Sequence, residues 1–139
     1  NVLSPMLLTQ AFVKHLPASL SGHVITLSDG IMGWSVSPQF FSYAASKLAW
    51  LPLTDLLAAS LAPRIRMNTV ALGATLPGVM DTPKSFERLA EISPLKRTSN
   101  TDEVCRTLSY LIETPSITGQ VFYLSSGMHL SAERWMKAE

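Results

Sequence analysis

A tyrosine and a lysine four positions apart, Tyr43 and Lys47, are the residues of this sequence best suited to acid–base chemistry. On a helix, residues four apart lie one above the other, so both side chains can act on one small volume. An ammonium group beside a phenol favours the ionised form, and we therefore expect Lys47 to lower the pKa of Tyr43 toward the range useful for proton transfer. The bare spacing is more often found on a solvated helix face, so its context has to decide.

That context is an apolar run at 24–27 that ends in Ser28 and Asp29. The run is typical of a buried strand. A carboxylate at the C-terminal end of such a strand would face the crevice in which open α/β sheets bind their ligands. Tyr43 follows a short way downstream, so the order of these residues indicates an active site.

Composition restricts the possible functions. The 139 residues are 47% hydrophobic and 15% charged, which suits one small domain with a core. A net charge of +1 without a basic run predicts neither a nucleic-acid nor a membrane-surface partner. The single cysteine, Cys105, cannot form an intramolecular disulfide, and we expect it to be a buried thiol. We find no signal peptide or membrane span, and the scattered histidines predict no metal site. A cytoplasmic protein is expected.

Hydrophobic periodicity predicts alternating helices and strands. Pro52 lies inside the longest predicted helix and should bend its axis. The segment Asn100–Glu103 has the pattern of a capping box before a helix. The predicted helices are 5–16, 40–62, 85–92 and 104–113, and the predicted strands are 23–28, 64–71 and 120–124.

Strands separated by helices predict an α/β fold whose parallel sheet is covered on both faces. A sheet of three strands is small, and the sequence has no glycine-rich turn able to cradle a phosphate. We therefore expect residues 1–130 to supply the C-terminal half of a doubly wound, Rossmann-like sheet, with 131–139 as a tail. A longer natural chain is part of this expectation.

Several ordered motifs resemble the short-chain dehydrogenase/reductase family over nearly all of residues 1–130. None of them is specific alone, but their order and spacing together are. The matching pieces are Asn1 with Leu7–Gln10, Val24–Asp29, Tyr43–Ala49, Leu61–Asn68, Ser93–Leu95, Glu103–Val104 and Thr118–Gly119.

The resemblance implies roles for individual residues. Tyr43 would be the general acid, and Lys47 would lower its pKa and bind the nicotinamide ribose of the cofactor. Asn1 falls where the family has the asparagine of its proton relay. The loop of Leu72, Gly73, Ala74 and Thr75 would hold the nicotinamide carboxamide through backbone groups, although the family usually has proline where this chain has Leu72.

Asp29 departs from the usual family pattern, which has a serine at the end of this strand. An ionised aspartate would raise the pKa of Tyr43, whereas a protonated one could donate a hydrogen bond to a heterocycle. Within the family, an aspartate here resembles pteridine reductases and dihydromonapterin (dihydrofolate-type) reductases, as does the ending Gly127–Leu130. The interval from Asp29 to Tyr43 is one residue longer than is usual in the family, which an insertion at 34–38 would explain. Alternatively, Ser28 serves and Asp29 points away.

The resemblance thus implies an NADPH-dependent oxidoreductase acting on a reduced pterin or dihydrofolate-like ring, with NADH as the alternative cofactor. General carbonyl or alcohol oxidoreduction is a second hypothesis. A non-catalytic module is a third. In this family the helices corresponding to 5–16 and 41–62 commonly pack across a two-fold axis, so a homodimer or homotetramer is also implied.

Overall fold

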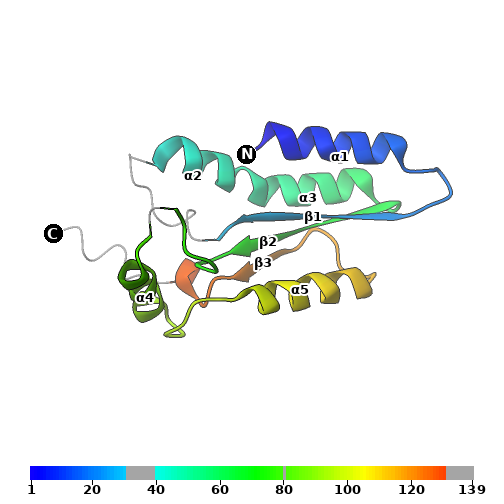
Figure 1. Cartoon of the computed structure of the whole chain (residues 1–139). Coiled ribbons are helices and arrows are strands. Elements are labelled where there is room, and N and C mark those ends of the chain that lie inside the picture. Colours follow the sequence, from blue (N-terminus) through cyan, green and yellow to red (C-terminus); the bar gives the residue numbers. More distant parts are fainter. Residues whose placement is uncertain (31–39, 80, 131–139) are drawn as a thin grey trace.

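The computed structural model describes residues 1–30, 40–79 and 81–130. In these ranges a parallel sheet lies between two layers of helices, with α1, α2 and α3 on one side and α5 on the other, while α4 lies beyond the carboxyl ends of the strands (Figure 1). The predicted insertion at 34–38 and the predicted tail at 131–139 lie outside the described residues.

The sheet has three strands in the order β1-β2-β3, all parallel. They are β1 (Gly22–Asp29), β2 (Ile65–Leu72) and β3 (Val121–Leu124). In the register of the sheet, Asp29 pairs with Leu72, and Leu72 pairs with Leu124. The carboxyl ends of the strands are therefore level with one another. This arrangement confirms the predicted α/β fold and the Rossmann-like C-terminal half.

The helices agree with the predicted ones to within a few residues, apart from the longest. They are α1 (Leu3–His15), α2 (Phe41–Leu48), α3 (Trp50–Leu61), α4 (Pro83–Ile92) and α5 (Thr101–Glu113), followed by a short 3₁₀ helix at Met128–Leu130. Within the described ranges none of them is long and apolar enough to span a membrane.

The single helix predicted at 40–62 is wrong, because the structure has α2 and α3 in its place with a break at Ala49. Pro52 has no N–H to donate to the carbonyl of Leu48, four residues earlier. The hydrogen-bond ladder is therefore interrupted one turn before the proline. Pro52 itself lies in the first turn of α3, where a missing donor costs least.

The core between α3 and the sheet combines apolar contacts with one buried chain of hydroxyls. Trp50 and Ala58 of α3 pack on Met67 of β2. Thr54 donates to the carbonyl of Trp50, and Thr69 contacts both Thr54 and Thr26 at 2.6 Å. Because the Thr54 hydrogen is used, Thr69 must donate to Thr54, and Thr26 to Thr69. The chain ties α3, β2 and β1 together.

Helix α5 begins at the predicted capping box, with Asn100 and Glu103 each bonding the other's backbone N–H. Cys105 is exposed, so the predicted buried thiol is wrong. The side chains that α5 turns inward recur at Val104, Leu108 and Leu111. Cys105 lies one position off that stripe and therefore faces outward.

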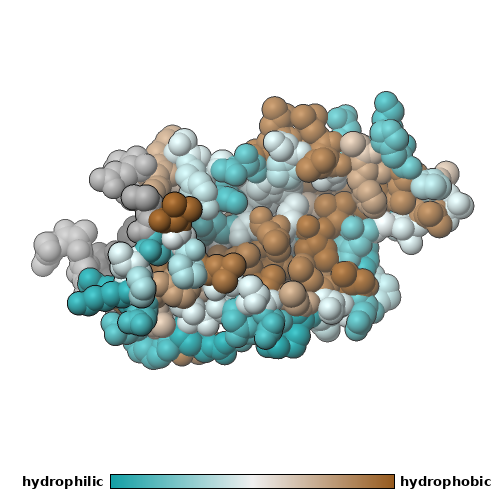
Figure 2. Space-filling model, in the orientation of Figure 1, coloured by the Kyte–Doolittle hydropathy of each residue, from teal (hydrophilic) through white to brown (hydrophobic). Residues whose placement is uncertain are grey.

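Large apolar side chains remain exposed on α1 and at the outer edge of the sheet, among them Leu8 (70% exposed) and Leu27 (52% exposed). Figure 2 shows apolar residues gathered over α1 and at the level of the sheet, whereas hydrophilic residues cover the rim formed by α4 and α5. The two helical layers thus differ in the surface that they present.

Candidate active site

Tyr43 and Asp29 meet at the carboxyl end of the sheet. Asp29 is the last residue of β1, and Tyr43 lies in the first turn of α2. The Tyr43 hydroxyl donates to Oδ2 of Asp29 at 3.1 Å. The Tyr43 side chain is 38% exposed, so a bound molecule can reach it. A proton donor and a carboxyl therefore share one accessible position.

The pKa of Tyr43 lies above its ordinary value of 10.0, because burial raises it first, and the charge of Asp29 and the hydrogen bond to it raise it further. The Lys47 ammonium is 5.6 Å from the centre of the Tyr43 ring, over its face rather than at its hydroxyl. The lowering of this pKa that the Tyr-x-x-x-Lys spacing predicted is therefore not the net result.

Ser28 and Asp29 point to opposite faces of the sheet, as neighbours on a strand must. Ser28 is buried, and its hydroxyl donates to the main-chain carbonyl of Lys47 at 3.3 Å. Asp29 is therefore the one of the two whose side chain contacts Tyr43. The alternative, in which Ser28 serves and Asp29 points away from the site, does not fit this geometry.

Asn1 lies beside α2 and α3. Its side-chain amide donates to the Ser46 hydroxyl at 3.2 Å, and its carbonyl accepts from the Trp50 indole at 2.7 Å. Asn1 and Lys47 line the same hollow, with a volume of about 640 Å³, under α1. Trp50 was missed as a site residue, although it follows Lys47 by only three positions, across the break at Ala49.

The loop Leu72–Thr75 follows β2 next to Asp29. Gly30 donates its N–H to the Leu72 carbonyl at 2.7 Å, and Gly73 donates to the Leu124 carbonyl at 2.8 Å. A Cβ on Gly73 would lie 2.6 Å from the Cα of Ser125, so only glycine permits this close approach. The loop lines a largely apolar hollow of about 430 Å³ together with the start of α5.

The ending Gly127–Leu130 packs on the far side of that loop. His129 Nδ1 and the Ser125 hydroxyl are 2.6 Å apart, and the His129 ring stacks on Tyr123 at 4.3 Å. Burial lowers the pKa of His129, which favours the neutral ring. Ser125 is also the residue that Gly73 touches, so His129 supports the loop from behind.

A phenol, an ammonium, a carboxyl and an amide thus lie around the carboxyl end of a parallel sheet, where open α/β folds bind their ligands. The phenol is neutral at physiological pH, since its ordinary pKa of 10.0 already exceeds that pH and the site raises the pKa further. A neutral phenol can donate a proton to an atom that gains electrons. The site is therefore equipped for reduction with proton delivery.

Comparison with known proteins adds the family. A family model described as Enoyl-(Acyl carrier protein) reductase matches residues 1–129. The crystal structure of FolM alternative dihydrofolate reductase 1 from Brucella canis, complexed with NADP, is 42% identical with a TM-score of 0.86, over 92% of this chain and 51% of that one.

Two curated relatives agree. The ketoacyl reductase of the granaticin polyketide synthase from Streptomyces violaceoruber is 30% identical over 94% of this chain and 53% of the relative. Human dehydrogenase/reductase SDR family member 4 is 33% identical over 91% of this chain and 48% of the relative. The chain spans about half the length of these relatives. The family model and the shared fold show that the chain belongs to the short-chain dehydrogenase/reductase family.

Proposed function

We propose that residues 1–130 form the catalytic half of an NADPH-dependent reductase whose substrate is a reduced pterin or dihydrofolate-like ring. The observation that carries the proposal is the 3.1 Å hydrogen bond between Tyr43 and Asp29, because it puts a carboxyl where a ketone reductase needs a hydroxyl donor. The 42% identity to a structure described as an alternative dihydrofolate reductase supports the same substrate class.

In this proposal Tyr43 is the proton donor. Its hydroxyl turns from Asp29 to the substrate atom that gains the electron pair, and Lys47 stabilises the phenolate left behind. Asp29, when protonated, donates to a ring nitrogen or carbonyl and fixes the plane of the heterocycle. Asn1 holds the Lys47 side of the site through its contacts with Ser46 and Trp50.

A nicotinamide cofactor supplies the hydride when it is bound. The residues present fit such a group, because the Lys47 ammonium lies over the Tyr43 ring and the loop Leu72–Thr75 begins at the residue that pairs with Asp29 in the sheet. The Lys47 ammonium would bind a ribose hydroxyl, and the loop would offer backbone groups to a carboxamide. NADPH is the proposed cofactor, with NADH as the alternative in the same assay.

General carbonyl reduction is the second candidate function. It is favoured by the 30% identity to a ketoacyl reductase over nearly the whole chain. Both functions use Tyr43 in the same way. They differ in Asp29, because a ketone needs a hydrogen-bond donor beside the phenol and an ionised carboxylate offers none.

The test of the proposal is NADPH oxidation by the purified protein with a dihydropterin and with a simple ketone. Tyr43→Phe should lower dihydropterin turnover by about a hundredfold or more, since it removes the proposed general acid. Tyr110→Phe is the matched control, because Tyr110 is an exposed tyrosine on α5, and it should leave turnover unchanged. Turnover of ketones alone would favour the second function. No turnover and no cofactor binding would favour a non-catalytic module.

A second variant separates the two substrate classes. Asp29→Ser restores a neutral hydroxyl donor at the end of β1. It should abolish dihydropterin reduction while ketone reduction persists or increases. If Asp29→Ser leaves the dihydropterin rate unchanged, Asp29 does not select the substrate.

We also propose that a second copy of the chain packs on the α1–α3 side. Leu3, Leu7 and Leu56 are all more than half exposed there. A mostly apolar groove of about 540 Å³ runs between the two helices. A homodimer or homotetramer of this chain would bury the exposed apolar surface over α1 in an interface.

A further inference from the structure

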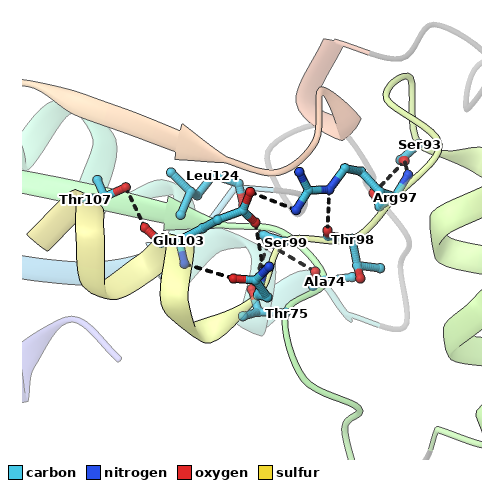
Figure 3. Close-up of polar contacts among 10 residues, drawn as sticks. Ala74, Thr75, Ser93, Arg97, Thr98, Ser99, Glu103, Thr107 and Leu124 are labelled. Carbon is cyan, nitrogen blue, oxygen red and sulfur yellow. Dashed lines mark hydrogen bonds and ion pairs between the residues drawn. The ribbon is translucent and has the colours of Figure 1, made fainter.

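Ser99 is a buried serine, 5% exposed, whose hydroxyl lies among groups that belong to the loop Leu72–Thr75 and to the end of β3 (Figure 3). Its oxygen is 3.1 Å from the carbonyl oxygens of Ala74 and Leu124, and 2.9 Å from the hydroxyl of Thr75. Its main-chain N–H also donates to the Ala74 carbonyl at 3.1 Å. One residue thus touches the loop at two successive positions.

The hydroxyls of Ser99 and Thr75 have fewer hydrogens to donate than they have acceptor oxygens within hydrogen-bond distance. Each hydroxyl has one hydrogen to donate. They face the carbonyls of Gly73, Ala74 and Leu124 as well as each other. Ser99 can thus donate to the loop or to β3 while Thr75 donates to Gly73, and the loop stays bonded in either arrangement. Removing Ser99's hydroxyl leaves Thr75 as the remaining hydroxyl donor of this pair.

The backbone on both sides of Ser99 is held in place. The Arg97 guanidinium binds Glu103 at 2.7 Å (Figure 3). Glu103 in turn closes the capping box with Asn100. The Ser93 hydroxyl donates to the Arg97 carbonyl at 2.7 Å. Ser99 is therefore presented to the loop from a fixed support, and it can impose a position rather than follow one.

The contact also sets the direction of a peptide group. In a trans peptide the carbonyl and the following N–H point in opposite directions. The Ala74 carbonyl points to Ser99, so the N–H of Thr75 points away from it. The Thr75 N–H is therefore the group of this peptide that can donate to a ligand at the loop.

We infer that Ser99 is a positioning residue that holds the loop Leu72–Thr75 in the conformation that receives the cofactor. The inference rests on the proposed function for the identity of that ligand. The structural part, that the Ser99 hydroxyl fixes the loop, does not depend on it.

Hydrogen exchange of the whole chain tests the structural part without any cofactor. Ser99→Ala should speed amide exchange in segment 73–76 by about five- to tenfold, the effect of one lost hydrogen bond, while α5 and β3 keep their rates. Ser60→Ala is the matched control, because Ser60 is an exposed serine on α3 that bonds only within its helix, to Leu56. Unchanged exchange in segment 73–76, or an equal rise throughout the protein, would overturn the inference.

If Ser99→Ala does not fold, Thr75→Val probes the same pair from the loop side, and it should speed exchange in the same segment. NADPH titration of wild type and of each folded variant then tests the ligand. The dissociation constant and the KM for NADPH should rise about five- to tenfold in Ser99→Ala, with a smaller change in kcat. A loosened loop with unchanged NADPH affinity would refute its cofactor role. If the wild type binds no NADPH, the proposed function fails, and exchange still decides the role of Ser99.

Discussion

At the scale of single residues, the site depends on the opposition between Asp29 and Lys47 around one phenol. The carboxyl accepts the Tyr43 hydrogen at 3.1 Å, whereas the ammonium lies over the ring at 5.6 Å. Burial raises the pKa of Tyr43 most, and the charge of Asp29 and the hydrogen bond to it raise it further. Because the folded protein holds this proton more tightly than the unfolded chain, Tyr43 stabilises the fold below about pH 10, and this stabilisation is lost as the pH rises through the folded pKa.

Asp29→Asn tests this opposition. The amide keeps a hydrogen-bond acceptor but loses the charge, so the pKa of Tyr43 should fall toward its ordinary value. The measurement is the absorbance of tyrosinate against pH, with the Tyr43→Phe curve subtracted because the chain has three tyrosines. Asp55→Asn, at an exposed aspartate of α3, should leave the curve unchanged. An unchanged Tyr43 pKa in Asp29→Asn would mean that burial alone raises it.

At the scale of secondary structure, both ends of α5 were predicted, the start to within three residues and the end at Glu113, but the residue that binds its end was not. The Asn100–Glu103 capping box is a local pattern, and it fixed the start of the helix to within three residues. The end of α5 is bound by Arg66, from a distant strand. Its guanidinium donates to the carbonyls of Leu111, Ile112, Thr114 and Ile117. Such a partner, 45 or more positions away, leaves no local signal.

Arg66→Met should lower the free energy of unfolding by about 2–3 kcal/mol, because the carbonyls at the negative end of α5 and that of Ile117 just beyond it lose a charged donor. Urea denaturation measures the loss. Arg88→Met removes the same charge from an exposed position of α4 and should change the stability by less than about 0.5 kcal/mol. Equal effects of the two substitutions would show that net charge, not helix capping, is responsible.

The same distinction separates the predicted from the unpredicted parts of the site. Tyr43, Lys47 and Asp29 were found because a helical spacing and a strand ending are local patterns. Trp50 follows Lys47 by three positions, but its indole donates to a carbonyl 49 positions away. Ser99 contacts its loop over 24 and 25 positions. Contacts of this length exist only once the sheet has formed, so no spacing in the sequence predicts them.

At the scale of the whole molecule, the exposed apolar side of α1 predicts self-association. Leu7→Lys places a charge on the groove between α1 and α3, which should convert a dimer to monomers if a second copy covers that groove. Sedimentation velocity over a range of protein concentrations measures the change. Leu76→Lys is the matched control, because Leu76 is an exposed leucine far from α1 in sequence, in the loop after β2. A monomeric wild type, or a Leu7→Lys variant that stays dimeric, would contradict this interface.

Besides the apolar side of α1, the outer edge of β1 is also exposed. Gly22 and Gly30 donate their N–H groups to β2, and backbone groups alternate along a parallel strand. The N–H groups of Ile25 and Leu27 therefore face away from β2. Within the described ranges β1 has no strand on that side. The hollow of about 640 Å³ under α1 runs along this edge and is bordered by both residues.

Amide exchange followed residue by residue should show that alternation. Ile25 and Leu27 should exchange much faster than Val24 and Thr26, whose N–H groups face β2. A form of the protein as long as its relatives, of which this chain spans about half, should slow the exchange of Ile25 and Leu27 by placing a further strand beside β1. Slow exchange of these two amides in the present chain would instead mean that copies pair edge to edge, and dilution below the association range would then restore the fast rates.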